Sequence, residues 1–342
     1  MRVGVIGAGL QGKRLAPAVR NHPRTELVVV SAAHHESAAR LAQSLNCESA
    51  IGWQPVVERD DLDAVVVCTP PHLHAEISIA AMRRGRHVLC EKPLARTVAE
   101  AEDMVATAQR EGVRLQCAFN HRFHPGIVQA REWFDGGAIG APVFLRCRYG
   151  IGGRAGYEKE GRCDPRIVGG GQMMKQGIHA VDLARWFLDG FTEVTALVQS
   201  QYWSIAPLED NTFALYRTEN GVVASIHSSL TQWKNLFSFE LFGRDGYIQV
   251  EGLGSGYGSE RAILGRRDFS APFGEDVIEF RGPDPCWAGQ WNEFVSAVED
   301  GREPLVSGQD GVEALRLVHA AYESARQGRV YTVRREAIRE PA

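Results

Sequence analysis

Short apolar runs alternate with helical patterns over the first third of this 342-residue chain. The runs, which are rich in valine and other apolar residues, lie at 2–9, 26–33, 63–70, 87–93 and 113–120. Strands that are apolar throughout are buried on both faces, and strands joined by helices usually run parallel. The alternation therefore predicts a doubly wound parallel sheet, the Rossmann architecture that binds nucleotides.

The pattern changes after about residue 123. A helical segment at about 125–135 comes first, and residues 191–251 then consist mainly of strand and turn patterns. The turns at 218–221 and 243–246 contain Asn-Gly and Asp-Gly, which are typical of β-hairpins. We therefore predict a Rossmann domain at 1–122, a second α/β domain with an antiparallel sheet at 123–333, and a polar tail at 334–342.

Charge and cysteine usage narrow the functional classes. The formal charge of −4 gives no basic surface for nucleic acid and no polybasic membrane signal. The seven cysteines are dispersed and form no C-x-x-C pair, so we expect reduced thiols without a disulfide framework or a metal site. With a strand at its start and no apolar run of membrane length, the chain is expected to be a cytoplasmic enzyme or sensor.

A glycine motif follows the first apolar run. Gly7, Gly9 and Gly12 have the G-x-G-x-x-G spacing of "GAGLQG", between a predicted strand and a predicted helix. In this context the first glycine permits a tight turn, the second lets a pyrophosphate approach the backbone, and the third lets helix and strand pack closely. The N–H groups at the helix start would then bind the phosphates.

The end of the second run bears on the choice of cofactor. Enzymes that prefer NAD carry an acid there, but this chain has Ala32 and Ala33, and the next acid is Glu36. Ser31 and His34 could instead donate to a 2′-phosphate. The sequence thus favours NADP over NAD weakly, and both remain open.

Two further strand ends are expected near the nicotinamide. "CTPPHLH" (68–74) contains the pair His72 and His74, which we interpret as part of the cofactor pocket because no further metal ligands have suitable spacing. "CEKPLA" (90–95) places Lys92 where ligands of open α/β sheets bind. An ammonium there could hydrogen-bond a substrate oxygen.

Taken together, these motifs resemble the glucose–fructose oxidoreductase / inositol dehydrogenase (Gfo/Idh/MocA) family. The resemblance rests on "GAGLQG", "CTPPHLH" and "GRHVLCEKPLA", and it continues through "FNHRFHP" (119–125) and "GGGQMMKQGIHAVDLARW" (169–186). It implies a Rossmann domain followed by an α/β domain with a large, mostly antiparallel open sheet. It also implies pyridine-nucleotide chemistry on sugars or polyols, and a homodimer or homotetramer formed through that sheet.

The resemblance assigns roles to particular residues. Lys92 and His179 match the catalytic pair that contacts the reacting oxygen, and Lys175 stands where the family usually has Asp. The expected cofactor contacts are Gly7, Gly9, Leu10, Gln11, Gly12, Ser31, Ala32, His34, Thr69, Pro70, His74, Glu91 and Lys92. The expected substrate contacts are Asn120, Arg122, Arg154, Tyr157, Lys175 and His179.

Lys175 is the departure with the largest consequences. It lies four residues before His179, so in a regular helix both side chains would share one face. Two lysines in one pocket would repel, and the pKa of at least one would fall. Such a pocket would suit an anionic substrate, or Lys175 could act as a base; a weakened redox site is the third possibility.

We therefore predict an NAD(P)-dependent dehydrogenase or reductase that acts on a sugar, a cyclitol or a sugar derivative, with an anionic substrate as one option. The alternative is a redox-neutral glycosidase or lyase, in which transient oxidation permits elimination before the hydride returns. A non-catalytic sensor is less favoured because Lys92 and His179 are both present.

Overall fold

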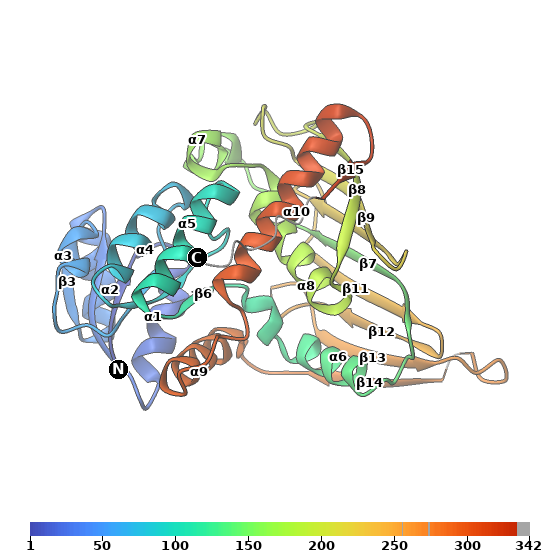
Figure 1. Cartoon of the computed structure of the whole chain (residues 1–342), viewed down its shortest axis with the longest axis horizontal. Coiled ribbons are helices and arrows are strands. Elements are labelled where there is room, and N and C mark those ends of the chain that lie inside the picture. Colours follow the sequence, from blue (N-terminus) through green and yellow to red (C-terminus); the bar gives the residue numbers. More distant parts are fainter. Residues whose placement is uncertain (255, 273, 334–342) are drawn as a thin grey trace.

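A computed structural model describes residues 1–254, 256–272 and 274–333 of the chain; the tail predicted at 334–342 lies outside these ranges. Two sheets stand at opposite ends of the molecule, with helices between them (Figure 1). The arrangement agrees with the predicted combination of a parallel sheet and a larger, mostly antiparallel one.

The first sheet has six parallel strands in the described residues. In spatial order they are β3 (Glu48–Ile51), β2 (Glu26–Ala32), β1 (Arg2–Ile6), β4 (Ala64–Val67), β5 (His87–Cys90) and β6 (Leu115–Cys117). The helices that connect them are α1 (Gly12–Asn21), α2 (His35–Leu45), α3 (Gln54–Val57), α4 (His74–Met82) and α5 (Val98–Glu111). Because the strand order reverses between β1 and β4, this sheet is doubly wound as predicted.

The turn from β1 to α1 needs two of its glycines. Gly7 has φ +113°, a conformation that side chains with a Cβ rarely adopt. A Cβ on Gly12 would lie 1.8 Å from the carbonyl oxygen of Gly7, so the helix can approach the strand only without one. A Cβ on Gly9 would meet nothing within 4 Å, which leaves open space beside the turn.

The second sheet has nine strands in the described part of the chain. Their order is β14 (Glu275–Phe280), β13 (Glu260–Arg266), β12 (Gly246–Glu251), β11 (Leu236–Gly243), β7 (Pro142–Gly150), β10 (Val223–Ser229), β9 (Asn211–Thr218), β8 (Phe191–Gln199) and β15 (Tyr331–Thr332). β7 and β10 pair in parallel, whereas the other neighbours are antiparallel.

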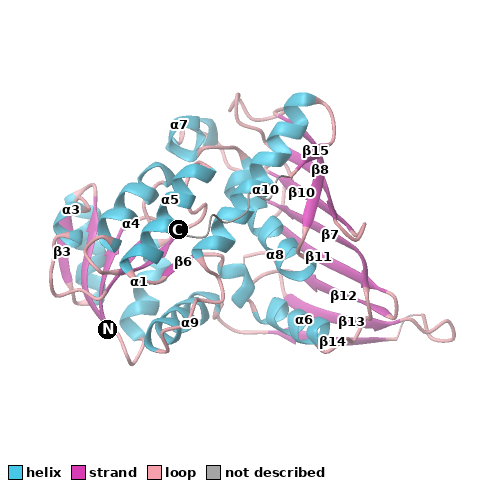
Figure 2. Ribbon diagram, in the orientation of Figure 1, coloured by secondary structure: helices cyan, strands magenta, loops and turns pink. Residues whose placement is uncertain are grey.

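The remaining helices lie mostly between the two sheets (Figure 2). They are α6 (Pro125–Asp135), α7 (Pro165–Val168), α8 (Ile178–Leu188), α9 (Cys286–Glu299) and α10 (Gly308–Gln327), with short turns η1 (Pro71–Leu73), η2 (Asn120–Phe123), η3 (Tyr157–Lys159), η4 (Gly161–Cys163) and η5 (Met173–Gly177). α9 returns to the first sheet, where Trp291 and Phe294 pack in the same core as Val5 and Leu15. None of the described helices combines the length and the apolar character needed to cross a membrane.

The two faces of the large sheet differ. α6, α8 and α10 cover one face, and Figure 2 shows no helix over the opposite face in the part of the chain that is drawn as described. Residues alternate along β9: Ala214 and Tyr216 are buried, whereas Phe213 and Leu215 are 45% and 51% exposed. This alternation leaves apolar side chains on the open face.

The glycine turn yields a first prediction. Gly12→Ala should lower the free energy of unfolding by more than about 3 kcal/mol, because the new methyl group collides with backbone that cannot yield. Gly9→Ala is the matched control, and its effect should stay within about 1 kcal/mol because the added methyl meets open space. Urea unfolding of both variants measures the difference; equal losses would contradict this account of the turn.

Candidate active site

Lys92 links the two halves of the molecule. It follows β5 at the carboxyl edge of the parallel sheet, and its Nζ donates a hydrogen bond to the backbone carbonyl of Lys175. Lys175 belongs to the turn η5, which leads directly into α8. A side chain from the first sheet thus reaches the segment that carries His179.

The helix around Lys175 is not regular. Residues Met173–Gly177 form a π-helical turn, and the α-helix begins only at Ile178. The expected i, i+4 relation between Lys175 and His179 therefore does not apply, because a π turn is wider than an α turn. Instead, Nζ of Lys175 donates to the Tyr157 hydroxyl at 3.0 Å and to the Arg162 carbonyl at 3.3 Å.

Buried Glu209 holds the start of this turn. Its carboxylate accepts hydrogen bonds from the backbone N–H groups of Gly171 and Met173, at 3.0 and 2.8 Å, and from the Tyr322 hydroxyl at 2.8 Å. Burial raises the pKa of Glu209, although these hydrogen bonds oppose the rise. The backbone of the glycine-rich segment is thus fixed by a side chain from the loop that precedes β9.

Burial is the largest influence on the titratable groups here. It lowers the pKa of both Lys92 and Lys175, and Arg162 is a cation that lowers both further. We expected repulsion between the two lysines to lower the pKa of at least one of them. The main cause of the lowered pKa is instead burial. Burial also raises the pKa of Glu91, beside Lys92, to about 7.

His179 lies in the first turn of α8, buried against other rings. Its imidazole stacks on that of His121, with ring centroids 3.7 Å apart and an interplanar angle of 16°. Burial is the main reason that the pKa of His179 falls well below 6.5. The neighbouring groups His121, Lys92 and His124 lower it further. Nδ1 of His179 is buried and has no hydrogen-bond partner among the described residues. The imidazole is therefore neutral near pH 7.

His121 is a residue of the site that sequence reasoning missed. Its Nδ1 lies 3.2 Å from Asn120 Oδ1, and its Nε2 lies 3.0 Å from the Tyr149 hydroxyl. Tyr149 in turn contacts Tyr257 at 3.3 Å, and Tyr257 accepts from Gln176 at 2.9 Å. This chain of hydrogen bonds fixes the ring that stacks on His179. "FNHRFHP" contains His121, but no spacing in the sequence indicates the stack.

Asn120 and Arg122 have partners inside the protein. The Asn120 amide nitrogen donates a hydrogen bond to Cys286 Sγ at 3.2 Å. Asn120 Oδ1 lies 3.2 Å from Nδ1 of His121. Arg122 is buried and pairs with Asp182 at 2.5 and 2.9 Å, with Asp310 at 3.2 Å, and with the Leu305 carbonyl at 3.0 Å. These contacts favour a structural role over the substrate contact that we expected.

The charged segment at 152–171 spans the two halves. The Arg166 carbonyl accepts from Arg96 at 3.0 Å, and α7 packs against η1, which follows β4. Tyr157 is buried against Trp203 and under the Lys175 ammonium, and burial raises its pKa to about 12. Arg154 instead points to Glu160, with which it pairs at 2.7 Å, and its side chain is exposed.

The predicted cofactor contacts lie along the same edge of the first sheet. Gly9 and Leu10 are exposed before α1, and the N-cap residue Gln11 makes no side-chain capping bond. The N–H groups of Lys13 and Arg14 donate to the carbonyls of Gly9 and Gln11, at 3.0 Å each, so the open space at Gly9 is the feature of this turn that fits a pyrophosphate.

The other predicted contacts differ in exposure. His34 is the exposed N-cap of α2, whereas Ser31 is fully buried and its hydroxyl has no partner among the described residues. Ala32 is partly buried, Thr69 is partly buried, and Pro70 is exposed. Buried His74 lies 2.8 Å from the carbonyl oxygens of both Thr69 and Pro93, and so ties the loop after β4 to the loop that carries Lys92.

The sequence and the fold are similar to those of known proteins. Residues 1–119 match the family model described as "Oxidoreductase family, NAD-binding Rossmann fold", and residues 127–249 match "GFO/IDH/MocA C-terminal domain". The chain is 27% identical to levoglucosan dehydrogenase of Pseudarthrobacter phenanthrenivorans, over 95% of this chain and 96% of that protein. It is 30% identical to dTDP-3,4-didehydro-2,6-dideoxy-alpha-D-glucose 3-reductase of Streptomyces antibioticus, over 95% and 97%. A solved structure of levoglucosan dehydrogenase in complex with NADH shares the fold, with a TM-score of 0.88, 24% identity, and coverage of 98% and 100%.

The stacked histidines yield a second prediction. The imidazole of His179 should stay neutral down to a pH well below 6.5, as followed by NMR of ¹⁵N-histidine-labelled protein with His179→Gln to assign the signal. His121→Ala should raise the pKa of His179 towards 6.5, because it admits water and removes a neighbouring ring. His121→Phe keeps an apolar ring in place, so the pKa should stay low. An unchanged midpoint in His121→Ala would contradict the account.

Proposed function

Because this chain belongs to the Gfo/Idh/MocA family of NAD(P)-dependent oxidoreductases, we propose that it transfers a hydride between a nicotinamide cofactor and a hydroxyl-bearing carbon of a sugar, a cyclitol or a sugar derivative. Its curated relatives are named as dehydrogenases and reductases, which favours net oxidation or reduction over the redox-neutral alternative.

The observation that carries this proposal is that Lys92 reaches the turn leading into α8, where its charge lowers the pKa of His179. Lys92 comes from the carboxyl edge of the parallel sheet, and His179 from the helix that covers the large sheet. In the oxidation direction, neutral His179 accepts the hydroxyl proton of the substrate, and Lys92 stabilises the negative charge that develops on that oxygen. Reduction runs these steps in reverse. When bound, the nicotinamide ring accepts or supplies the hydride.

Residues at the edge of the first sheet would hold the cofactor. The turn at Gly7, Gly9 and Gly12 and the start of α1 would bind the pyrophosphate. His34, exposed at the start of α2, remains the candidate for a 2′-phosphate, whereas buried Ser31 offers less. Since Glu36 is the first acid after β2, we keep NADP as the favoured cofactor, with NAD as the other outcome of the test.

The substrate class is the finer part of the proposal. Relatives are named for levoglucosan, a dTDP-sugar and myo-inositol, which supports a polyhydroxylated ring. Lys175 anchors Tyr157 and Arg162 of the segment at 152–171, so we propose that it positions this segment over the substrate rather than acting as a base. Arg162 is exposed, and its positive charge lowers the pKa of both Lys92 and Lys175. This concentration of positive charge favours a substrate that carries an anionic group.

The protein is proposed to work in the cytoplasm. All seven cysteines lie in the described residues and are free, and four of them are buried. Free thiols are typical of proteins from reducing compartments, where disulfides rarely persist.

A third prediction tests the reaction. Purified protein, given each cofactor and a panel of neutral sugars, inositols, uronates and glycosides, should reduce the cofactor in a subset of wells, as followed by absorbance and product analysis. Lys92→Ala and His179→Ala should lower turnover by about 10² to 10⁴. Lys234→Ala, which removes an exposed lysine before β11, is the control and should retain full turnover.

Three outcomes would change the proposal. Substrate consumption without net cofactor reduction would indicate the redox-neutral reaction. Near-normal turnover of both variants would refute the assignment of Lys92 and His179. A response limited to neutral sugars would refute the anionic substrate.

We also propose that copies of this chain associate through the open face of the large sheet, as a homodimer or a homotetramer. Besides Phe213 and Leu215, this face of β8 and β9 exposes Leu197, which is 71% accessible. A contiguous apolar surface of this kind is typical of an interface rather than of a surface that faces water.

A fourth prediction follows. Light scattering after size exclusion should give a mass of two or four chains for the native protein and of one chain for Leu215→Arg, because a buried unpaired charge opposes association. Val128→Arg, on helix α6, is the control and should retain the native mass. A monomeric native protein, or an unchanged mass in Leu215→Arg, would refute the interface.

A further inference from the structure

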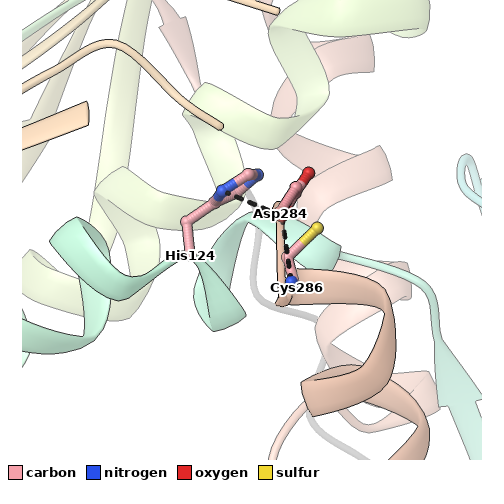
Figure 3. Close-up of side chains that lie close together, drawn as sticks. All are labelled: His124, Asp284 and Cys286. Atoms are coloured by element: carbon pink, nitrogen blue, oxygen red, sulfur yellow. Dashed lines mark hydrogen bonds and ion pairs between the residues drawn. The ribbon is translucent and has the colours of Figure 1, made fainter. Parts of the chain in front are cut away.

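Three side chains from two segments of the chain lie close together near His121 (Figure 3). His124 is the N-cap of α6, Asp284 lies before α9, and Cys286 is the first residue of α9. One ligand atom from each lies within 4.8 Å of the others. His124 and Cys286 are buried, and Asp284 is partly buried.

Nδ1 of the His124 imidazole makes no hydrogen bond among the described residues. Nδ1 lies 3.6 Å from Asp284 Oδ1 and 3.4 Å from Oε2 of buried Glu260, but neither contact forms a hydrogen bond. Among the described residues this buried nitrogen therefore has no hydrogen-bond partner, although both carboxylates lie within ion-pair distance of it. Such an atom is unfavourable, and two carboxylates beside it add negative charge to the same place.

We propose that His124, Asp284 and Cys286 bind a divalent cation of the zinc type. Imidazole nitrogen, carboxylate oxygen and thiolate sulfur are the ligands that zinc takes in proteins. Three protein ligands leave the fourth tetrahedral position for a water molecule. Glu260 adds negative charge next to the imidazole, and it is fixed by backbone N–H groups of Gly126 and Gly254 at 2.6 and 2.8 Å.

A thiol that binds zinc gives up its proton, because the ligand is the thiolate. A bound cation displaces that proton, and zinc binding should release it to solvent. The Asn120 amide, 3.2 Å from Cys286 Sγ, then donates to the thiolate.

Solvent can reach the site. A pocket of about 740 Å³ opens beside it, and its lining includes Pro125, Glu260, Asp284 and Pro285. The cation would join the start of α6, which follows the parallel sheet, to the start of α9, which returns to that sheet. It would also hold His124 close to His121, whose ring centroid is 5.5 Å away and which stacks on His179. The role is therefore structural, and it does not depend on the proposed hydride transfer.

The test uses the full chain, purified without a histidine tag, stripped with chelator and desalted. After incubation with Zn²⁺ and a second desalting, mass spectrometry of the metal should give about one equivalent per chain, and Tm should rise by several degrees. With Co²⁺ in place of Zn²⁺, a sulfur-to-cobalt charge-transfer band should appear, because a thiolate is among the ligands.

Matched variants locate the ion. Cys286→Ser and Asp284→Asn should lose most of the bound metal, and Cys286→Ser should also lose the cobalt band. Cys163→Ser removes a thiol that hydrogen-bonds the Tyr157 carbonyl in the segment at 152–171, and it should keep both signals. Asp284→Asn keeps an acceptor for the Cys286 N–H, so it reports on the site even if Cys286→Ser misfolds.

The proposal would be overturned by a native protein that retains no metal after desalting. It would equally be overturned by Cys286→Ser and Asp284→Asn variants that fold and hold as much metal as the native protein, because the ion would then bind elsewhere.

Discussion

The buried ion pair between Arg122 and Asp182 is the contact on which the arrangement of the two sheets depends. Arg122 follows the last strand of the parallel sheet, Asp182 lies on α8, and Asp310, on α10, adds a second carboxylate. Removing one partner of such a pair costs about 3–5 kcal/mol, because the remaining charge is buried without compensation. The pair therefore holds α8, and with it His179, against the end of the parallel sheet. The Arg122 guanidinium also lies over the Trp186 ring, which further excludes water.

With α8 held in place, the chemistry of the candidate site follows from burial. Lys92 follows strand β5 and His179 lies on helix α8, and burial lowers the pKa of both. The π turn before α8 matters because it directs the Lys175 carbonyl to Lys92 and the Lys175 ammonium to Tyr157. One residue thereby connects the proposed catalytic lysine with the segment proposed to cover the substrate. Burial, with the His121 ring stacked beside it, lowers the pKa of His179 and so favours the neutral imidazole that a proton acceptor needs.

Much of the fold could be predicted because its signals are local. Apolar runs between helical patterns indicated the parallel sheet, and Gly7, Gly9 and Gly12 indicated the turn that a nucleotide requires. The family resemblance added the large antiparallel sheet and the pair Lys92 and His179. Other features depend on contacts that no local pattern contains. Regular helical spacing did not anticipate a π turn at Lys175. No spacing in the sequence indicated the two carboxylates, on α8 and α10, that pair with Arg122; its proposed substrate contact stays a prediction.

By itself, then, the sequence determined the order and type of the elements and the position of the glycine turn that we propose binds the phosphates. These follow from periodicity and from the conformational range of glycine, whereas the proposed pair Lys92 and His179 rests on the family resemblance. Only the tertiary structure decided which of those residues meet. The stack of His121 on His179, the bond from Lys92 to the Lys175 carbonyl, and the cluster of His124, Asp284 and Cys286 all join segments far apart in the chain. Such contacts depend on how helices pack between two sheets, and that packing depends on the whole interior rather than on any spacing along the chain.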